Sequence, residues 1–189
     1  MILSDKDIRQ AIKDGKISIE PYDENCIQPA SVDLHLDKHF LVFDTKKHFV
    51  IDTKKPVDQI MKEIEIDEET PFVLHPREFA LGTTMEITGV DSEHVARLEG
   101  KSSIGRLGLL IHVTAGFLDP GNKLKMTLEL YNTSSLPILL YYKMSIAQMA
   151  FEKISSKCEK PYSKKRGSSY VGDMKPKASQ IWKSFIRIF

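Results

Sequence analysis

Short apolar segments separated by turn residues fill the chain from Phe72 to Phe151, and this pattern constrains the fold more than any other feature. Several segments alternate polar and apolar residues or are rich in β-branched and aromatic side chains, which is typical of β-strands. The predicted strands are 72–74, 79–84, 94–98, 109–113, 124–131, 138–142 and 146–151. Many short strands at close spacing, with few helices, predict a mainly β fold: a sandwich, a barrel or a jelly roll.

The N-terminal part of the chain adds two predicted helices. Ser4 can cap a first helix that Gly15 ends, and Asp7 stands three residues after Ser4 as in a capping box. Pro56 can open a second helix, because residues 57, 60, 61 and 64 are apolar at helical spacing. Strands are predicted at 17–19 and at 31–36, the latter continuing through 40–43.

The bulk composition is that of an ordinary globular domain. The chain has 189 residues, of which 41% are hydrophobic and 28% charged, with a net charge of +1. One domain with a real core is expected, and the charge gives no reason to expect a nucleic-acid or membrane surface. The N-terminus lacks the basic start and apolar core of a signal peptide, so we expect a cytoplasmic protein. Cys26 and Cys158 are far apart, which makes a disulfide framework or zinc site unexpected.

Lysine and arginine become frequent after Phe151, interleaved with glycine and serine. We therefore divide the chain into a β domain, residues 1–160, and a flexible basic C-terminal tail of the same domain, residues 161–189. Such a tail is either solvated and without function, or a lid that folds over an anionic ligand and supplies cations when it closes.

Glu129 is the most conspicuous candidate for chemistry. It lies in the predicted strand 124–131, among neighbours that alternate as in a half-buried strand. A charge in that setting is costly unless it is paired or used. The carboxylate could pair with an arginine such as Arg106, face solvent, or act as a general base.

Residues 100–106, GKSSIGR, could form a short helix or turn. Small hydroxyl residues beside glycines let a backbone approach a phosphate closely, and Lys101 and Arg106 supply positive charge. The segment is not a Walker P-loop, because Val95 stands where that motif needs its first glycine. An ordinary capped turn remains the alternative.

Three further residues have a structural and a functional interpretation. Asp119 can support the Asp119-Pro120-Gly121 turn or bind a sugar hydroxyl. Gln148, on a predicted strand, could contact a base edge or point outward, and His112 is expected in the core. None of the 6 histidines is followed two places on by glutamate, and there is no CxxC. A zinc-type nucleobase deaminase is therefore not expected, and a hydrolysis here would use a side-chain base.

The chain carries, in order, the strings QPASVDL (28–34), GKSSIGR (100–106), TAGFLDPG (114–121) and TLE (127–129). Together they resemble the deoxycytidine triphosphate (dCTP) deaminase family of the trimeric deoxyuridine triphosphatase (dUTPase) superfamily. The resemblance runs through nearly the whole chain. It implies a distorted β-barrel or jelly roll of the dUTPase-like type, assembled as a homotrimer with active sites between subunits. It also implies zinc-independent deamination, with Mg²⁺ bound through the nucleotide triphosphate and dTTP as a possible inhibitor.

The family roles fall on matching positions. Glu129 would be the catalytic base that activates water for attack on cytosine C4, with Ser102 and Arg106 holding the water, the glutamate and the pyrimidine. Asp119 would bind the deoxyribose 3′-hydroxyl. The residues that the resemblance implies in substrate binding are Lys101, Ser102, Ser103, Ile104, Gly105, Arg106, Ala115, Asp119, Thr127, Leu128, Glu129, Gln148, Tyr162, Tyr170 and Asp173.

The tail departs from the family pattern at two positions. Ser169 replaces a lysine, and Asp173 replaces a glutamine. An aspartate would repel a γ-phosphate, so the grip of this lid on substrate would need compensation. The candidate cations are Lys164, Lys165, Arg166 and Lys175.

The product depends on a second step. Ala115-Gly116-Phe117 resembles the bifunctional members, which continue from dUTP to dUMP and pyrophosphate and so supply dUMP for thymidylate synthesis. A small residue at 116 would leave room for a second water near the α-phosphate. The main alternative is a monofunctional dCTP deaminase that releases dUTP. A dUTPase without deaminase activity, or a catalytically inactive nucleotide-binding regulator, are further alternatives, and Glu129 argues against both.

Overall fold

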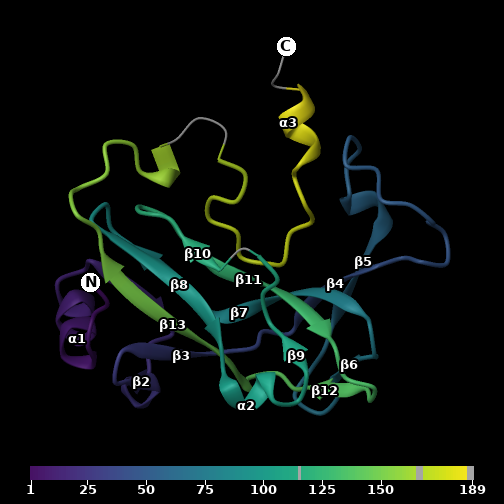
Figure 1. Cartoon of the computed structure of the whole chain (residues 1–189), viewed down its shortest axis with the longest axis horizontal. Coiled ribbons are helices and arrows are strands. Elements are labelled where there is room, and N and C mark those ends of the chain that lie inside the picture. The colour runs from purple at the N-terminus through teal and green to yellow at the C-terminus, as the bar shows by residue number, and fades with distance from the viewer. Residues whose placement is uncertain (115, 165–167, 187–189) are drawn as a thin grey trace.

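The computed structural model describes residues 1–114, 116–164 and 168–186. Its strands form two large antiparallel sheets and one small sheet (Figure 1). The first sheet has the order β5-β4-β7-β11-β9, with β1 also paired to β7. Its strands are β1 (Ile17–Glu20), β4 (His39–Phe43), β5 (Met61–Glu65), β7 (Phe79–Val90), β9 (Leu109–Leu110) and β11 (Lys123–Asn132).

The second sheet has the order β10-β8-β13-β3-β2. Its strands are β2 (Ile27–Gln28), β3 (Ser31–His35), β8 (His94–Gly100), β10 (Phe117–Leu118) and β13 (Ser145–Lys153). The small sheet pairs β6 (Phe72–Leu74) with β12 (Ile138–Leu140). The prediction of a mainly β fold is confirmed. The described sheets do not close into a barrel, and the arrangement is that of a jelly-roll-like sandwich.

The helices are few and short. They are α1 (Asp5–Lys13), α2 (Ser102–Gly105) and α3 (Trp182–Ile186), with 3₁₀ turns η1 (Glu24–Cys26), η2 (Asp58–Ile60) and η3 (Tyr162–Lys164). The first predicted helix is confirmed, since the Ser4 side chain accepts a hydrogen bond from the Asp7 N–H at its N-terminus. None of the described helices has the length and apolar character that crossing a membrane requires.

One hydrophobic core lies between the two large sheets. Leu34, Leu98 and Phe151 enter it from the second sheet, and Leu128 and Leu130 enter it from β11 of the first. All five side chains are at most 1% exposed. The alternating burial along β11 places Thr127 and Glu129 on the opposite, half-buried face of that strand.

Two predictions for the N-terminal half are wrong. The second helix is only the turn η2, because Met61 to Glu65 instead pair with β4 as strand β5. Helical spacing of apolar residues was overridden by tertiary strand pairing.

The expected continuous strand 31–43 is broken into β3 and β4, which belong to different sheets. Asp37 occupies the corner between them and is 4% exposed. Its N–H donates to the Thr83 carbonyl, and its carboxylate accepts from Lys125 Nζ at 2.6 Å. The predicted strand 109–113 is also shorter, since β9 ends at Leu110 and a loop follows.

Asn132, at the end of β11, ties three segments together. It is fully buried, and its side-chain amide donates to the carbonyls of Leu74 and Leu136 at 2.9 and 2.8 Å. Its side-chain oxygen accepts from the Ser134 N–H and hydroxyl.

Replacing Asn132 with alanine should lower the free energy of unfolding by about 2–4 kcal/mol, because it leaves buried carbonyls unpaired. Urea denaturation at one fixed chain concentration measures this. Asn25→Ala removes the same group from an exposed position and should change stability by less than about 0.5 kcal/mol. Equal effects of the two substitutions would contradict the role given to Asn132.

Candidate active site

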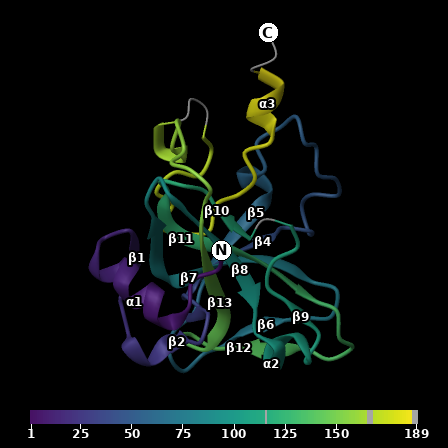
Figure 2. The ribbon, with the colours of Figure 1, turned by 60° about the vertical axis from the view of Figure 1, so that its left-hand side comes forward.

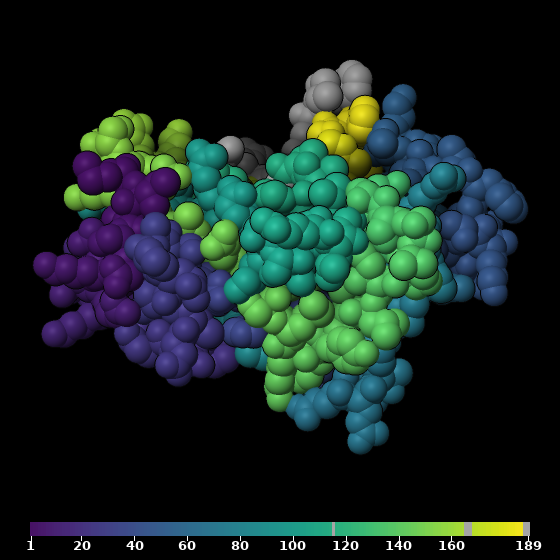
Figure 3. All heavy atoms as spheres, turned by 60° about the horizontal axis from the view of Figure 1, so that its bottom comes forward, coloured from purple at the N-terminus to yellow at the C-terminus, as the bar shows by residue number. Residues whose placement is uncertain are grey.

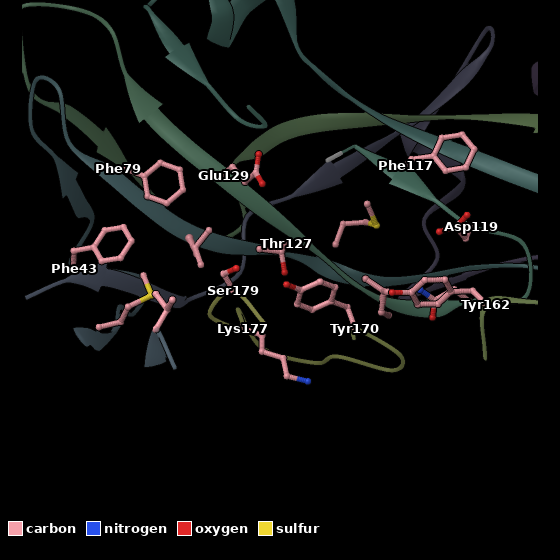
Figure 4. A pocket seen from close by; sticks show the side chains of 16 residues that line it. Phe43, Phe79, Phe117, Asp119, Thr127, Glu129, Tyr162, Tyr170, Lys177 and Ser179 are labelled. Carbon is pink, nitrogen blue, oxygen red and sulfur yellow. The ribbon is translucent and has the colours of Figure 1, made fainter. Parts of the chain in front are cut away.

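A pocket of about 420 Å³ lies over the outer face of β11 (Figure 4). Glu129, Thr127 and Asp119 are among its polar lining residues. An apolar part is lined by Phe43, Val57, Met61, Phe79 and Leu81, which come from β4, β5, β7 and the segment before η2. A planar, partly apolar ligand with a few polar edges is the kind of molecule that such a pocket accepts.

Glu129 is held by the backbone that follows β9. Its Oε2 accepts hydrogen bonds from the N–H groups of Val113 and Thr114, at 2.8 and 2.9 Å. The Glu129 N–H in turn donates to the Ile111 carbonyl. Among the described residues, Oε1 has no hydrogen-bond partner. One carboxylate oxygen is therefore anchored, while the other is free to accept a proton.

The Asp119 turn brings a second segment to the pocket. Asp119 O accepts from Asn122 N–H, and the turn has Gly121 at φ = 75°, where glycine is favoured. A Cβ on Gly121 would lie 2.5 Å from Pro161 Cβ, so only glycine allows this close approach. The adjacent Tyr162 N–H donates to the Pro120 carbonyl, which holds Tyr162 at the pocket beside Asp119.

The C-terminal segment 168–186 runs over the same end of the molecule as β10 and β11 (Figures 1 and 2). Tyr170, Lys177 and Ser179 line the pocket from this segment. The Lys125 N–H of β11 donates to the Asp173 carbonyl at 2.9 Å, which attaches the segment to the sheet. Tyr170 Oη accepts from the Gln180 N–H, so the segment also bonds to itself.

The charge of Asp173 is met by a cation that the sequence analysis missed. Lys177 Nζ lies 3.0 Å from Asp173 Oδ1. Of the four cations expected there, Lys175 pairs with Glu63 instead, and Lys164 forms no ion pair within the described part of the chain. Lys165 and Arg166 lie outside the described residues. Lys177 follows Asp173 by four residues, a spacing that could have drawn attention to it.

A second, separate pocket of about 310 Å³ collects the residues expected to bind phosphate. It is lined by Lys101, Ser102, Ser103 and Gln148, together with Gln28, Pro29, Ser31 and Asp33. Residues 102–105 form the short helix α2, as expected for a helix or turn. Ile104 is 8% exposed and packs into the core, so it fixes α2 on the protein, while Gly105 faces open space.

Within one chain, the residues expected to act together in catalysis do not lie together. Ser102 and Arg106 are exposed at α2, and no hydrogen bond or ion pair within the described part of the chain links Arg106 to Glu129. Figure 3 shows the surface that carries α2, in teal, beside the indigo region of β2 and β3. None of the residues that the structure describes lines both pockets. The pocket with Glu129 is hereafter the base half-site, and the pocket with Lys101 is the phosphate half-site.

Gly116, in the loop before β10, is closely surrounded by other atoms. A Cβ on Gly116 would lie 2.6 Å from His112 Cδ2 and 2.7 Å from the Leu98 carbonyl oxygen. The half-buried His112 ring and the Leu98 carbonyl therefore leave no room for a larger side chain at 116, and the second water expected near this residue stays a prediction. Ala115 lies outside the described residues. Leu128 is fully buried, so only its backbone is available to a ligand.

The sequence analysis missed the apolar part of the base half-site. Phe43 and Phe79 lie close, with ring centroids 6.1 Å apart, although they belong to different strands. No local motif marks these residues. Within the described ranges, no three His, Cys, Asp or Glu side chains are arranged to hold a metal ion.

Comparison with known proteins finds a matching family model and full-length relatives of this chain. A model of the dCTP deaminase-like family matches residues 2–154. A protein of Corynebacterium jeikeium described as a dUMP-forming dCTP deaminase is 47% identical over 186 residues, covering 98% of this chain and 99% of that protein. One of Beutenbergia cavernae with the same description is 47% identical over 188 residues, covering 99% of this chain and 98% of that protein.

A solved structure supports the fold. The 2′-deoxycytidine 5′-triphosphate deaminase of Agrobacterium tumefaciens matches with a TM-score of 0.63 at 22% identity, covering 81% of this chain. The match covers 48% of that chain, so this protein spans about half its length. The family model and the full-length relatives confirm the resemblance seen in the sequence motifs, and the chain belongs to the dCTP deaminase-like family.

Proposed function

We propose that this protein converts dCTP and water into dUTP and ammonia, and then hydrolyses dUTP to dUMP and pyrophosphate. The observation that carries the proposal is Glu129, a half-buried carboxylate with one oxygen anchored by two backbone N–H groups and the other without a hydrogen-bond partner among the described residues. Eight relatives at 45–47% identity, matched over nearly their whole length, are described as dUMP-forming dCTP deaminases.

The geometry of Glu129 suits a general base. Its Oε1 takes a proton from water, and the hydroxide that forms attacks cytosine C4. The proton then passes to the exocyclic nitrogen, the C4–N4 bond breaks, and ammonia leaves. The remaining hydroxyl proton moves to N3, and the C4 carbonyl of uracil forms. Because Oε2 stays bonded to Val113 and Thr114, the carboxylate keeps its orientation while it is protonated and deprotonated. In this proposal Thr127 and the Leu128 backbone contact the base or sugar, and Asp119 binds the 3′-hydroxyl.

The phosphate half-site suits the other end of the nucleotide. Lys101 supplies positive charge, and Ser102, Ser103 and Gln148 supply hydrogen-bond donors. Its one carboxylate, Asp33, already accepts from Lys101 and Gln28. These residues fit a Mg²⁺ ion that is held by the phosphate oxygens and water. The ion would neutralise charge on the triphosphate. dTTP has the same sugar and triphosphate, so we propose it as an inhibitor that competes for both half-sites.

We propose that the two half-sites are joined by a second copy of the chain. A single nucleotide carries its base and triphosphate together, whereas the two half-sites of one chain share no lining residue in the described ranges. Exposed apolar side chains lie between them along the chain: Leu107, Leu110, Val113 and Phe117 are 44–58% exposed. We propose a homotrimer in which α2 of one subunit supplies Ser102 and Arg106 to Glu129 of its neighbour. The cytoplasmic location and the absence of nucleic-acid and membrane partners stay predictions.

The product assay tests the function. Purified protein incubated with dCTP and Mg²⁺ should release ammonia and accumulate dUMP and pyrophosphate, resolved by ion-exchange chromatography. Accumulation of dUTP alone would indicate a monofunctional deaminase. Hydrolysis of dUTP without consumption of dCTP would indicate a dUTPase, and inertness towards both would indicate a nucleotide-binding regulator.

Glu129→Gln is the matched variant for this assay. The glutamine carbonyl oxygen can accept the same two backbone N–H groups, but it cannot act as the base. Deamination should therefore fall by at least about 10²-fold, while nucleotide binding is kept. Retained deamination would rule out the role of Glu129.

Mixed assemblies test the subunit arrangement. Glu129→Gln and Ser102→Ala chains should each be inactive alone. When co-expressed in equal amounts, they should recover about a quarter of the wild-type deamination rate, because a site that takes Glu129 and Ser102 from different chains is intact in that share of random combinations. Light scattering should give the mass of a trimer. A mixture that stays inactive would place both residues of each site on one chain.

A further inference from the structure

Strand β3 presents a row of polar side chains to the phosphate half-site. Its inward residues Val32 and Leu34 are buried in the core, so Ser31, Asp33 and His35 share the other face. Ser31 bonds to the side chain of Gln148, and Asp33 bonds to the side chain of Lys101. Both partners line the phosphate half-site. His35 instead bonds to Glu86 and does not line that half-site.

Asp33 holds Lys101. Asp33 Oδ2 lies 2.5 Å from Lys101 Nζ and also accepts from Gln28 Nε2 at 3.2 Å. The side chains of Lys101 and Asp33 are 26% and 15% exposed, so the pair is well shielded from solvent. A lysine has a long, flexible stem, and fixing it before a ligand arrives removes part of the entropic cost of binding.

Ser31 holds Gln148 in a similar way. The Ser31 hydroxyl donates to Gln148 Oε1 at 2.9 Å. The carbonyl end of the amide is thereby engaged, which leaves the Nε2 group and its two N–H donors for the half-site. This orientation makes N–H donors available to an anion, while the carbonyl oxygen, which would repel an anion, is bonded to the Ser31 hydroxyl.

We propose that Asp33 and Ser31 are positioning residues, which act on triphosphate through Lys101 and Gln148 without touching it. The proposal rests on the proposed function in one respect, namely that the half-site binds a polyphosphate chain. A carboxylate in an anion-binding pocket repels the ligand by its charge. Asp33 offsets that repulsion by ordering the cation that contacts the phosphates.

Asp33→Asn separates these two effects because they have opposite signs. Removing the negative charge alone would tighten the binding of an anion. Losing the hold on Lys101 would weaken binding by about three- to tenfold. We expect the weaker binding, measured by calorimetry on the full chain with the dUTP analogue that has an imido group between the α- and β-phosphates. The affinity for dUMP, which lacks the β- and γ-phosphates, should change less than about twofold.

Two controls define the mechanism. Asp23→Asn makes the same charge change at an exposed residue whose carboxylate accepts hydrogen bonds from Asn25, and it should leave both affinities unchanged. In a Lys101→Met background, Asp33→Asn should weaken binding of the analogue less than about twofold further, because its target is gone. Ser31→Ala should also weaken binding of the analogue, and this loss should vanish in a Gln148→Ala background.

Three results would overturn the positioning role. These are tighter or unchanged binding of the analogue by Asp33→Asn, an equal loss for dUMP, and a full loss that persists with Lys101→Met. The last would mean that Asp33 acts on the ligand directly, for example through a cation. Wild-type protein that binds the analogue but does not deaminate dCTP would refute the proposed function alone, and protein without affinity for the analogue would overturn the positioning role.

Discussion

The two large sheets bury one face of each against the other, and this hydrophobic contact determines where the chemistry can lie. On β11, Leu128 and Leu130 are fully buried and each contributes about 1.5–3 kcal/mol from burial. The two-residue period of a strand then places Thr127 and Glu129 on the opposite face. The core contact that fixes the register of β11 therefore also aims the carboxylate at the base half-site, and a shift by one residue would bury the charge.

The rest of the candidate site comes from loops and from the C-terminal segment, which are held against the two sheets. Backbone N–H groups after β9 hold Glu129, the 119–122 turn packs on Pro161, and the C-terminal segment bonds to the edge of β11. Strand β3 of the second sheet alternates in the same way, and its outward residues bond to Lys101 and Gln148. Each sheet thus carries one half-site on the face that the core leaves free.

Sequence reasoning succeeded where the signal was local or carried by a family motif. The first helix was predictable because the Ser4 cap and the Gly15 end are short-range chemistry, and Glu129 was conspicuous because its neighbours alternate. It failed where contacts with segments distant in sequence determined the secondary structure. The segment 61–65 has helical spacing but pairs with β4, and the chain changes sheets at Asp37, whose partners Thr83 and Lys125 are far away in sequence. The apolar lining from Phe43 and Phe79 could not be predicted for the same reason, whereas the pair of Asp173 and Lys177 is local and its spacing was overlooked.

The way in which the C-terminal segment is attached to β11 affects how residue 173 can vary. The hydrogen bond from β11 goes to the carbonyl of Asp173, which every amino acid possesses, and the aspartate side chain bonds within its own segment. This bond itself does not depend on which side chain stands at 173. The Asp173 side chain, however, is only 12% exposed and its charge is paired with Lys177, so residues 173 and 177 have to change together while the main-chain anchor keeps the path of the segment over the sheet.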